Sequence, residues 1–210
     1  MRTIKKVASH IFIDGFGGMT QGLFATLIIG TMIQQIGLLI GGSTGNVIYL
    51  LGKAAAALTS AGIGVGVAVK YGESPLVTVS AAVAAMVGGY AGKITGGTFF
   101  VDGNAVLAGP GEPLGAFIAA FAGITCGHLV SGKTKVDIIV TPVVTIGVGS
   151  VVGLLVGPPI SQMMTGLGSI INWATEQRPF IMGIVVSVVI GMVLTLPISS
   201  AALGIILNLS

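Results

Sequence analysis

The stretch GMTQGLFATLIIGTMIQQIGLLI, residues 18–40, contains no charged residue. A helix that crosses the hydrocarbon core of a bilayer needs roughly 20 mostly apolar residues. The stretch therefore predicts a membrane-spanning helix. Five further apolar segments follow it along the chain, at residues 47–69, 76–92, 114–130, 136–156 and 180–207.

Together these segments predict an all-α fold: a polytopic integral membrane helix bundle with about six spanning helices, in a single domain over residues 1–210. Segments 76–92 and 114–130 are short, so tilt, re-entry and partial spanning stay open for them. The last segment contains Pro197, which predicts a kink or a break in that helix.

The composition of the chain favours the bilayer as its solvent. The 210 residues are 53% hydrophobic and only 7% charged, and the mean hydropathy is +1.05. A soluble domain typically carries roughly a quarter charged residues. This chain therefore has too few charges to cover a surface that faces water.

Several classes of site are not supported by the sequence. A single cysteine, Cys126, excludes a disulfide framework and a multi-cysteine metal site. His10 and His128 belong to no zinc-binding pattern, and the Gly-Lys-Thr of residues 132–134 lacks the earlier glycine of a phosphate-binding loop. There is also no basic run with interleaved aromatics that would indicate nucleic acid. We therefore expect no metal, no cofactor and no nucleic-acid partner.

Basic residues predict the orientation of the chain, because Lys and Arg are enriched in short cytoplasmic loops. A cytoplasmic N-terminus places six basic residues inside: Arg2, Lys5, Lys6, Lys70, Lys133 and Lys135. Lys93 and Arg178 then fall in outside loops, and Lys53 lies near the outer end of the second helix.

The loops differ in character. Residues 41–46 predict a simple glycine-rich turn. Residues 158–178 begin with Pro158-Pro159 and contain spaced apolar residues and Trp173. This pattern predicts an amphipathic helix at the membrane interface, with Trp173 as its anchor.

Small residues recur at a spacing of four along the apolar segments. Such stripes let helix backbones approach closely in a membrane. There are more of these faces than six helices need for their own packing, so we also expect a homo-oligomer. The stripes are Gly18-Gly22-Thr26-Gly30, Gly88-Gly92-Gly96, Gly149-Gly153-Gly157 and Gly183-Ser187-Gly191-Thr195-Ser199.

Glu112 is the most informative polar residue, in LAGPGEPLGAF, residues 107–117. Pro113 disfavours a helical conformation at Glu112 and starts the next helix. One interpretation is a solvated loop acid near a helix N-terminus. The other places the loop inside the bundle, where an expensive carboxylate marks a substrate or ion path. A sugar would donate hydroxyl hydrogen bonds to the carboxylate, whereas protonation of Glu112 would suit a proton-coupled carrier.

Three further residues are candidates for a substrate site with Glu112 and Pro113. Asp102 and Asn104 lie in Asp-Gly-Asn, which is also an ordinary turn sequence. Gln34 lies late in the first spanning segment. Adjacent helical positions point about 100° apart, so at most one of Gln34 and Gln35 faces squarely into the bundle.

Five blocks carry a resemblance to a known family: GLFATLIIGTMIQQIG, GPGEPLGAF, VDIIVTP, GPPI and RPFIMGIVVSVVIGMVLTLPISSAA. They resemble the membrane-embedded IIC component (EIIC) of the bacterial phosphotransferase system, in the branch that includes proposed toxin regulators. The resemblance implies a multi-pass protein of the bacterial plasma membrane. It also implies translocation of a carbohydrate, coupled to phosphoenolpyruvate-dependent phosphorylation by a separate IIB protein.

The resemblance further implies roles for two residues. In related carriers a Glu-Pro motif, on a loop that dips into the membrane, holds sugar hydroxyls. Glu112 matches the acid of this motif, and Pro113 shapes the loop. Family members used for comparison are longer, so a fragment, a short member and one half of a larger assembly all stay open.

Two other functions remain as alternatives. One is a secondary carrier or channel for another small solute, without phosphoryl chemistry. The other is a non-transporting membrane sensor or regulator with the same fold.

Overall fold

The computed structural model describes residues 14–175, 183–184, 187–188 and 191. Within these residues the fold is helical apart from one small β-hairpin. Most of the predicted segment 180–207, together with Arg178 and part of the last small-residue stripe, lies outside the described residues.

The predicted first spanning helix is confirmed as a continuous rod. It comprises α2 (Phe16–Leu23), the π-helical turn η2 (Phe24–Ile28) and α3 (Ile29–Ile40). Gly41 and Gly42 then adopt φ values of +66° and +62°, which only glycine adopts readily, and the chain reverses. Helix α4 (Gly42–Ala57) begins at once, so the turn is shorter than the predicted residues 41–46.

Helix α5 (Thr59–Lys70) continues from α4 after a bend of 52° at Leu58. Glycines bring these helices close to the first rod. A Cβ added to Gly22 would lie 2.3 Å from the carbonyl oxygen of Gly62, and one added to Gly30 would lie 2.8 Å from that of Gly52. The close packing predicted from the first small-residue stripe is therefore confirmed.

The body of the molecule is formed by α5, α6 (Pro75–Gly89), α8 (Pro113–Val130) and the first part of α9 (Asp137–Thr175). Its core also takes in α2 and η2. The fully buried apolar side chains there include Met19, Leu23, Leu27, Ile63, Val67, Val77 and Ile124. A Cβ added to Gly88 would meet the carbonyl oxygen of Gly115 at 2.4 Å, so the second stripe also packs against a neighbouring backbone.

Between α6 and α8 the chain forms short and irregular structure. Helix α7 (Ala91–Thr95) is followed by strands β1 (Phe100–Val101) and β2 (Asn104–Ala105). The strands are antiparallel and pair Phe100 with Ala105. An irregular segment, with Gly109 and Gly111 at positive φ, then leads to Glu112 and the start of α8.

The prediction that a spanning helix ends at residue 156, before a separate interfacial helix, is wrong. Helix α9 runs unbroken through Pro158 and Pro159 to Thr175 and carries the exposed Trp173. Neighbouring helices make proline tolerable within membrane helices. Here Gly157 packs onto α7, since a Cβ added to it would lie 2.5 Å from the Cβ of Ala91.

Three of the described helical segments are long and apolar enough to cross a membrane: Phe16–Ile40, Pro113–Val130 and Asp137–Ile170. The bent pair α4–α5 gives a fourth if it counts as one span, and Pro75–Gly89 is shorter. The described part of the chain thus gives three or four candidate spans of the six predicted.

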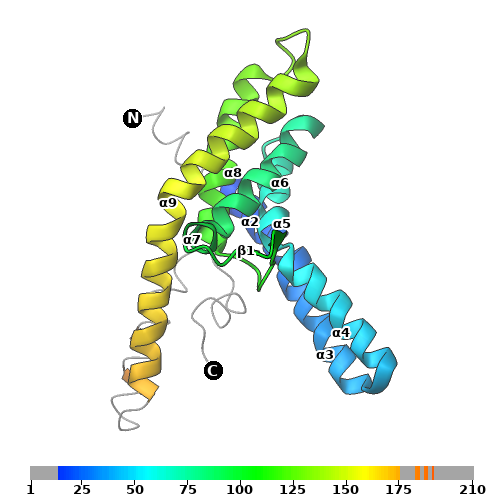
Figure 1. Ribbon diagram of the computed structural model, residues 1–210, viewed down its shortest axis with the longest axis vertical. Helices are drawn as coiled ribbons and strands as arrows, with labels where there is room; N and C mark the ends of the chain where they lie inside the picture. The colour runs from blue at the N-terminus through cyan, green and yellow to red at the C-terminus, as the bar shows by residue number, and fades with distance from the viewer. Residues whose placement is uncertain (1–13, 176–182, 185–186, 189–190, 192–210) are drawn as a thin grey trace.

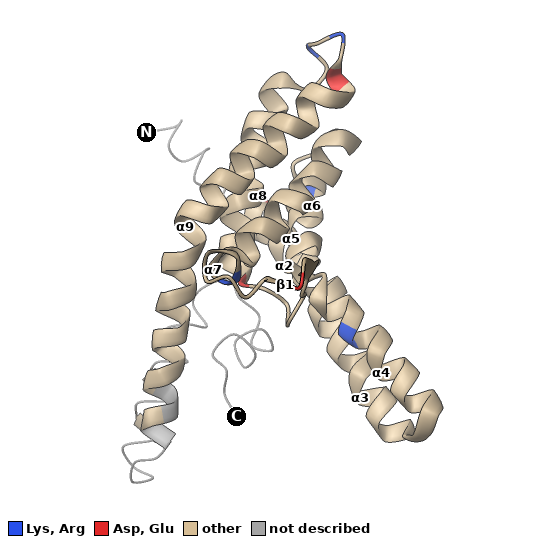
Figure 2. Ribbon diagram, viewed as in Figure 1, with Lys and Arg blue, Asp and Glu red and all other residues tan. Residues whose placement is uncertain are grey.

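Two arms extend from the body (Figure 1). One is the α3–α4 hairpin and the other is the later part of α9, with α7 and β1 lying near the point where the arms meet the body. Charged residues are sparse throughout (Figure 2). The arms expose many large apolar side chains, among them Leu38, Leu39, Leu51, Leu155, Met163 and Ile170.

The described lysines of the short loops separate into two groups. The α5–α6 turn, which follows Lys70, meets the α8–α9 loop of Lys133 and Lys135: Ser74 and Ser131 share a hydrogen bond of 3.0 Å. Beside it, His128 pairs with Glu73 at 3.0 Å. Lys93 lies near the opposite end of α8, whose 18 residues rise about 27 Å.

Candidate functional site

Glu112 is a buried carboxylate that caps a helix. Its backbone is extended, with φ −89° and ψ +114°, as expected before a proline. One carboxylate oxygen accepts a hydrogen bond of 3.0 Å from the Leu114 N–H, and the other accepts from the Gly115 N–H. Only 7% of the residue is exposed. Pro113 occupies the first helical position, where a missing N–H costs nothing.

The irregular segment before Glu112 is held by side chains from other parts of the fold. Three consecutive carbonyls accept hydrogen bonds: Ala108 from the Lys93 ammonium, Gly109 from the Tyr90 hydroxyl and Pro110 from the Ser60 hydroxyl. In addition, the Glu112 N–H donates to the Gly89 carbonyl at 2.7 Å. Backbone outside regular structure can be buried only when its polar groups find such partners.

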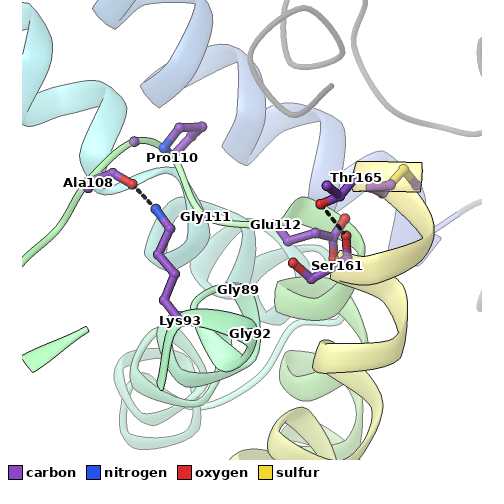
Figure 3. A pocket seen from close by; sticks show the side chains of 11 residues that line it. Gly89, Gly92, Lys93, Ala108, Pro110, Gly111, Glu112, Ser161 and Thr165 are labelled. Atoms are coloured by element: carbon purple, nitrogen blue, oxygen red, sulfur yellow. Dashed lines mark hydrogen bonds between the residues drawn. The ribbon is translucent and has the colours of Figure 1, made fainter. Parts of the chain in front are cut away.

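Glu112 lines a cavity of about 360 Å³. This volume falls in the usual range for small-molecule sites, roughly 300–1,000 Å³. Figure 3 shows Ser161 and Thr165 of α9 beside Glu112, while Lys93 reaches toward Ala108. The remaining lining is Gly89, Gly92, Ala108, Gly109, Pro110, Gly111 and Met164.

Burial shifts both ionisable groups of the cavity toward neutrality. Both groups lie outside the candidate spanning helices: Glu112 directly precedes the segment Pro113–Val130, and Lys93 belongs to the short helix α7. Desolvation raises the pKa of Glu112, although the hydrogen bonds from Gly115 and Leu114 oppose this. Desolvation lowers the pKa of Lys93. Each group thus has a smaller preference for its charged form than it would have in water.

The cavity lies beside the interior of an apolar helix and not at its end. From Asp137 to Ser161, α9 rises about 36 Å. Beyond Ser161 the helix still exposes Met163, Ile170 and Trp173. The irregular segment and Glu112 are therefore surrounded along α9 by apolar surface on both sides.

The structure does not bring all predicted site residues together. Glu112 lines the cavity, and the neighbouring Pro113 is buried but does not line it. Asp102 lies in the exposed turn of the β-hairpin, and Asn104 begins the exposed strand β2. The Asn104 amide donates to the Asp102 carbonyl at 3.3 Å. Gln34 lies in the α3–α4 arm and donates to the Gly30 carbonyl at 3.4 Å. These last three residues do not line the cavity.

The sequence prediction missed Lys93, Ser161 and Thr165 as lining residues. Ser161 and Thr165 are four residues apart, so they share one face of a continuous helix. The predicted helix over residues 158–178 gives the two residues the same spacing, but that helix was placed at the membrane interface and not beside Glu112. Lys93 was interpreted only as a loop charge. In the described residues, His, Cys, Asp and Glu form no group of three that could hold a metal.

Comparison with protein families settles what kind of chain this is. A model of the family "Phosphotransferase system, EIIC" matches residues 13–210. The chain belongs to this family. The EIIC chain is accordingly an integral membrane protein and a membrane transport component of the phosphotransferase system. Comparisons with curated proteins and with solved structures found no match.

Proposed function

We propose that this EIIC chain is the sugar-translocating component of a phosphoenolpyruvate-dependent phosphotransferase system, and that the carbohydrate binds in the Glu112 cavity. The observation that carries the proposal is a buried carboxylate on a cavity wall, in a chain with few charges. An ionisable residue among apolar helices costs free energy and usually marks a substrate or ion path.

The donors and acceptors of the cavity suit a polyhydroxylated solute. Each Glu112 oxygen accepts one backbone N–H and keeps a lone pair that can accept from a sugar hydroxyl. The Lys93 ammonium uses one of its three N–H groups on Ala108, so others are available to a sugar oxygen. Ser161 and Thr165 add hydroxyls that both donate and accept.

The phosphoryl chemistry is assigned to a separate IIB protein, and this chain would hold and release the sugar. In this proposal the chain lies in a bacterial plasma membrane with its N-terminus on the cytoplasmic side. Lys70, Lys133 and Lys135 then also face the cytoplasm. IIB would approach that end. A homo-oligomer is also part of this proposal. Because Gly22, Gly88 and Gly153 already pack against other helices of the same chain, its contacts must use other faces, and mass measurement in lipid nanodiscs tests it.

A thermal-stability screen of purified protein against sugars and sugar alcohols tests the sugar site. A ligand that binds the native state raises the melting temperature by mass action. We expect a selective shift in wild type that is lost in Glu112→Gln. Asp102→Asn is the matched control, because it makes the same chemical change at an exposed turn that does not line the cavity.

Vesicle assays then separate the proposed function from its alternatives. Uptake of the selected sugar that needs phosphoenolpyruvate and the phosphoryl-carrier proteins supports the proposal. Uptake driven by an ion gradient without those proteins would identify a secondary carrier. Binding without flux would identify a sensor or regulator.

A further inference from the structure

A second hollow adjoins the Glu112 cavity. It measures about 480 Å³ and lies between α7 and α9. It shares Gly92, Ser161 and Thr165 with the first cavity, so the two spaces meet along one row of residues. Gly92 keeps the two helices close, since a Cβ there would lie 2.9 Å from the Ser161 hydroxyl.

The second hollow is polar but carries no charge. Its own polar residues are Thr95 and Gln162. Among the residues that the structure describes, none forms a hydrogen bond with the Gln162 amide, so its donors and acceptor are available. Thr95 donates to the Ala91 carbonyl at 2.9 Å and keeps its capacity to accept. The first cavity differs, because Glu112 and Lys93 line it.

Each hollow alone has a volume within the range of small-molecule sites. Filling only the first would leave the Gln162 amide facing water or empty space. A neutral group with several hydroxyls matches the second hollow, because hydroxyls can both donate to and accept from an amide. The joined space thus has a charged half and a neutral half, each suited to a polyhydroxylated unit.

We infer that the joined cavities form one elongated site for a carbohydrate of two sugar units, with one unit at Glu112 and the other at Gln162. The inference rests on the proposed sugar function. It assigns Gln162 the role of a specificity-determining residue for the second unit. A disaccharide or a glycoside should therefore bind more tightly than its single sugar.

Calorimetric titration of the full chain in mild detergent tests this, with matched probes: glucose beside maltose and cellobiose, and N-acetylglucosamine beside its β-1,4-linked dimer. We expect at least one disaccharide to bind about tenfold more tightly than its monosaccharide. In Gln162→Leu that advantage should fall to within twofold, while affinity for the monosaccharide stays unchanged. Gln35→Leu is the control, since Gln35 is also an exposed glutamine on an apolar helix.

The possible outcomes are distinct. If monosaccharides bind and no disaccharide binds better, the elongated site is wrong and the proposed function stands. If Gln162→Leu keeps the full disaccharide advantage, as the control Gln35→Leu should, the role assigned to Gln162 is wrong. If no sugar of either size binds to well-folded protein, both proposals fail. Should Gln162→Leu not fold, Thr95→Val removes a hydroxyl from the same hollow and must reduce the advantage.

Discussion

The Ser60 hydroxyl on α5 donates a 2.9 Å hydrogen bond to the Pro110 carbonyl, which lies fifty residues further along the chain. Ser60 is completely buried. This contact ties helix α5 to the irregular segment that presents Glu112. The shape of the site therefore depends on a residue that does not line the cavity.

Replacing Ser60 by alanine should destabilise the protein and weaken sugar binding together. The change leaves the Pro110 carbonyl without its partner, and an unsatisfied buried polar group costs about 1–3 kcal/mol. Thermal unfolding and sugar titration measure the two effects. Ser169→Ala is the control, because the exposed Ser169 hydroxyl bonds only within its own helix. Equal behaviour of the two variants would contradict this role for Ser60.

Substitutions of Glu112 should separate helix capping from sugar binding. In Glu112→Ala the Leu114 and Gly115 N–H groups lose their acceptor, so we expect a loss of about 0.5–2 kcal/mol in the free energy of unfolding. Aspartate is a preferred cap, so Glu112→Asp should recover most of that stability. Its shorter side chain should still bind sugar poorly. Full sugar affinity in Glu112→Asp would refute the need for the longer carboxylate.

Stability should depend on pH through Glu112. Burial raises the pKa of Glu112 in the native state above the ordinary value of 4.5, which applies to the unfolded state. At pH values between the unfolded-state pKa and the native-state pKa, the native state binds more protons than the unfolded state. The contribution of Glu112 to stability is therefore fully present at low pH and declines as pH rises through this interval. Unfolding of wild type and Glu112→Gln across pH measures it. The glutamine variant should lack this decline, and parallel curves would contradict the assignment.

Sugar affinity should change with pH in the opposite direction. The ionised carboxylate is the stronger hydrogen-bond acceptor. Binding should therefore strengthen as pH rises through the raised pKa of Glu112. Titrations of wild type at several pH values test this. A constant affinity over that range would show that the charge of Glu112 does not contribute to recognition.

Two glycine-to-alanine substitutions, one inside a small-residue stripe and one outside the stripes, should have opposite effects on stability. Gly22→Ala places a Cβ 2.3 Å from the Gly62 carbonyl oxygen, and overpacking of this kind typically costs about 1–3 kcal/mol. Gly147→Ala in α9 meets nothing within 4 Å. It should be neutral or stabilise by up to about 1 kcal/mol, because alanine favours helix. Melting temperatures compare the two, and a tolerated Gly22→Ala would show that the helices can move apart.

Uninterrupted apolar segments were predictable from the sequence. Residues 18–40 and 114–130 form helices as expected, because length and hydropathy alone determine them. The course of α9 was not predictable from local rules. Pro158 and Pro159 normally indicate a helix end, but α9 continues through both of them, at the point where Gly157 packs onto α7. Packing of this kind depends on residues distant in the sequence.

The site was partly predictable for a similar reason. The two prolines around Glu112 indicate an irregular segment and a helix start, and both are present. Asp102, Asn104 and Gln34 were chosen for their polarity, which does not determine where a side chain lies. Lys93 and Ser161 come together only through the packing of α7 on α9. A sequence pattern alone does not contain that proximity.

The continuity of α9 has a mechanical consequence. One rigid rod connects the Lys133–Lys135 loop, just before Asp137, to Ser161 and Thr165 on the cavity wall. A partner that tilts the rod at its first turn displaces the cavity wall about 36 Å away. In the proposed function, with IIB at this first turn, the helix would act as a lever, and its three prolines, Pro142, Pro158 and Pro159, would set how stiffly force passes along it to the cavity wall.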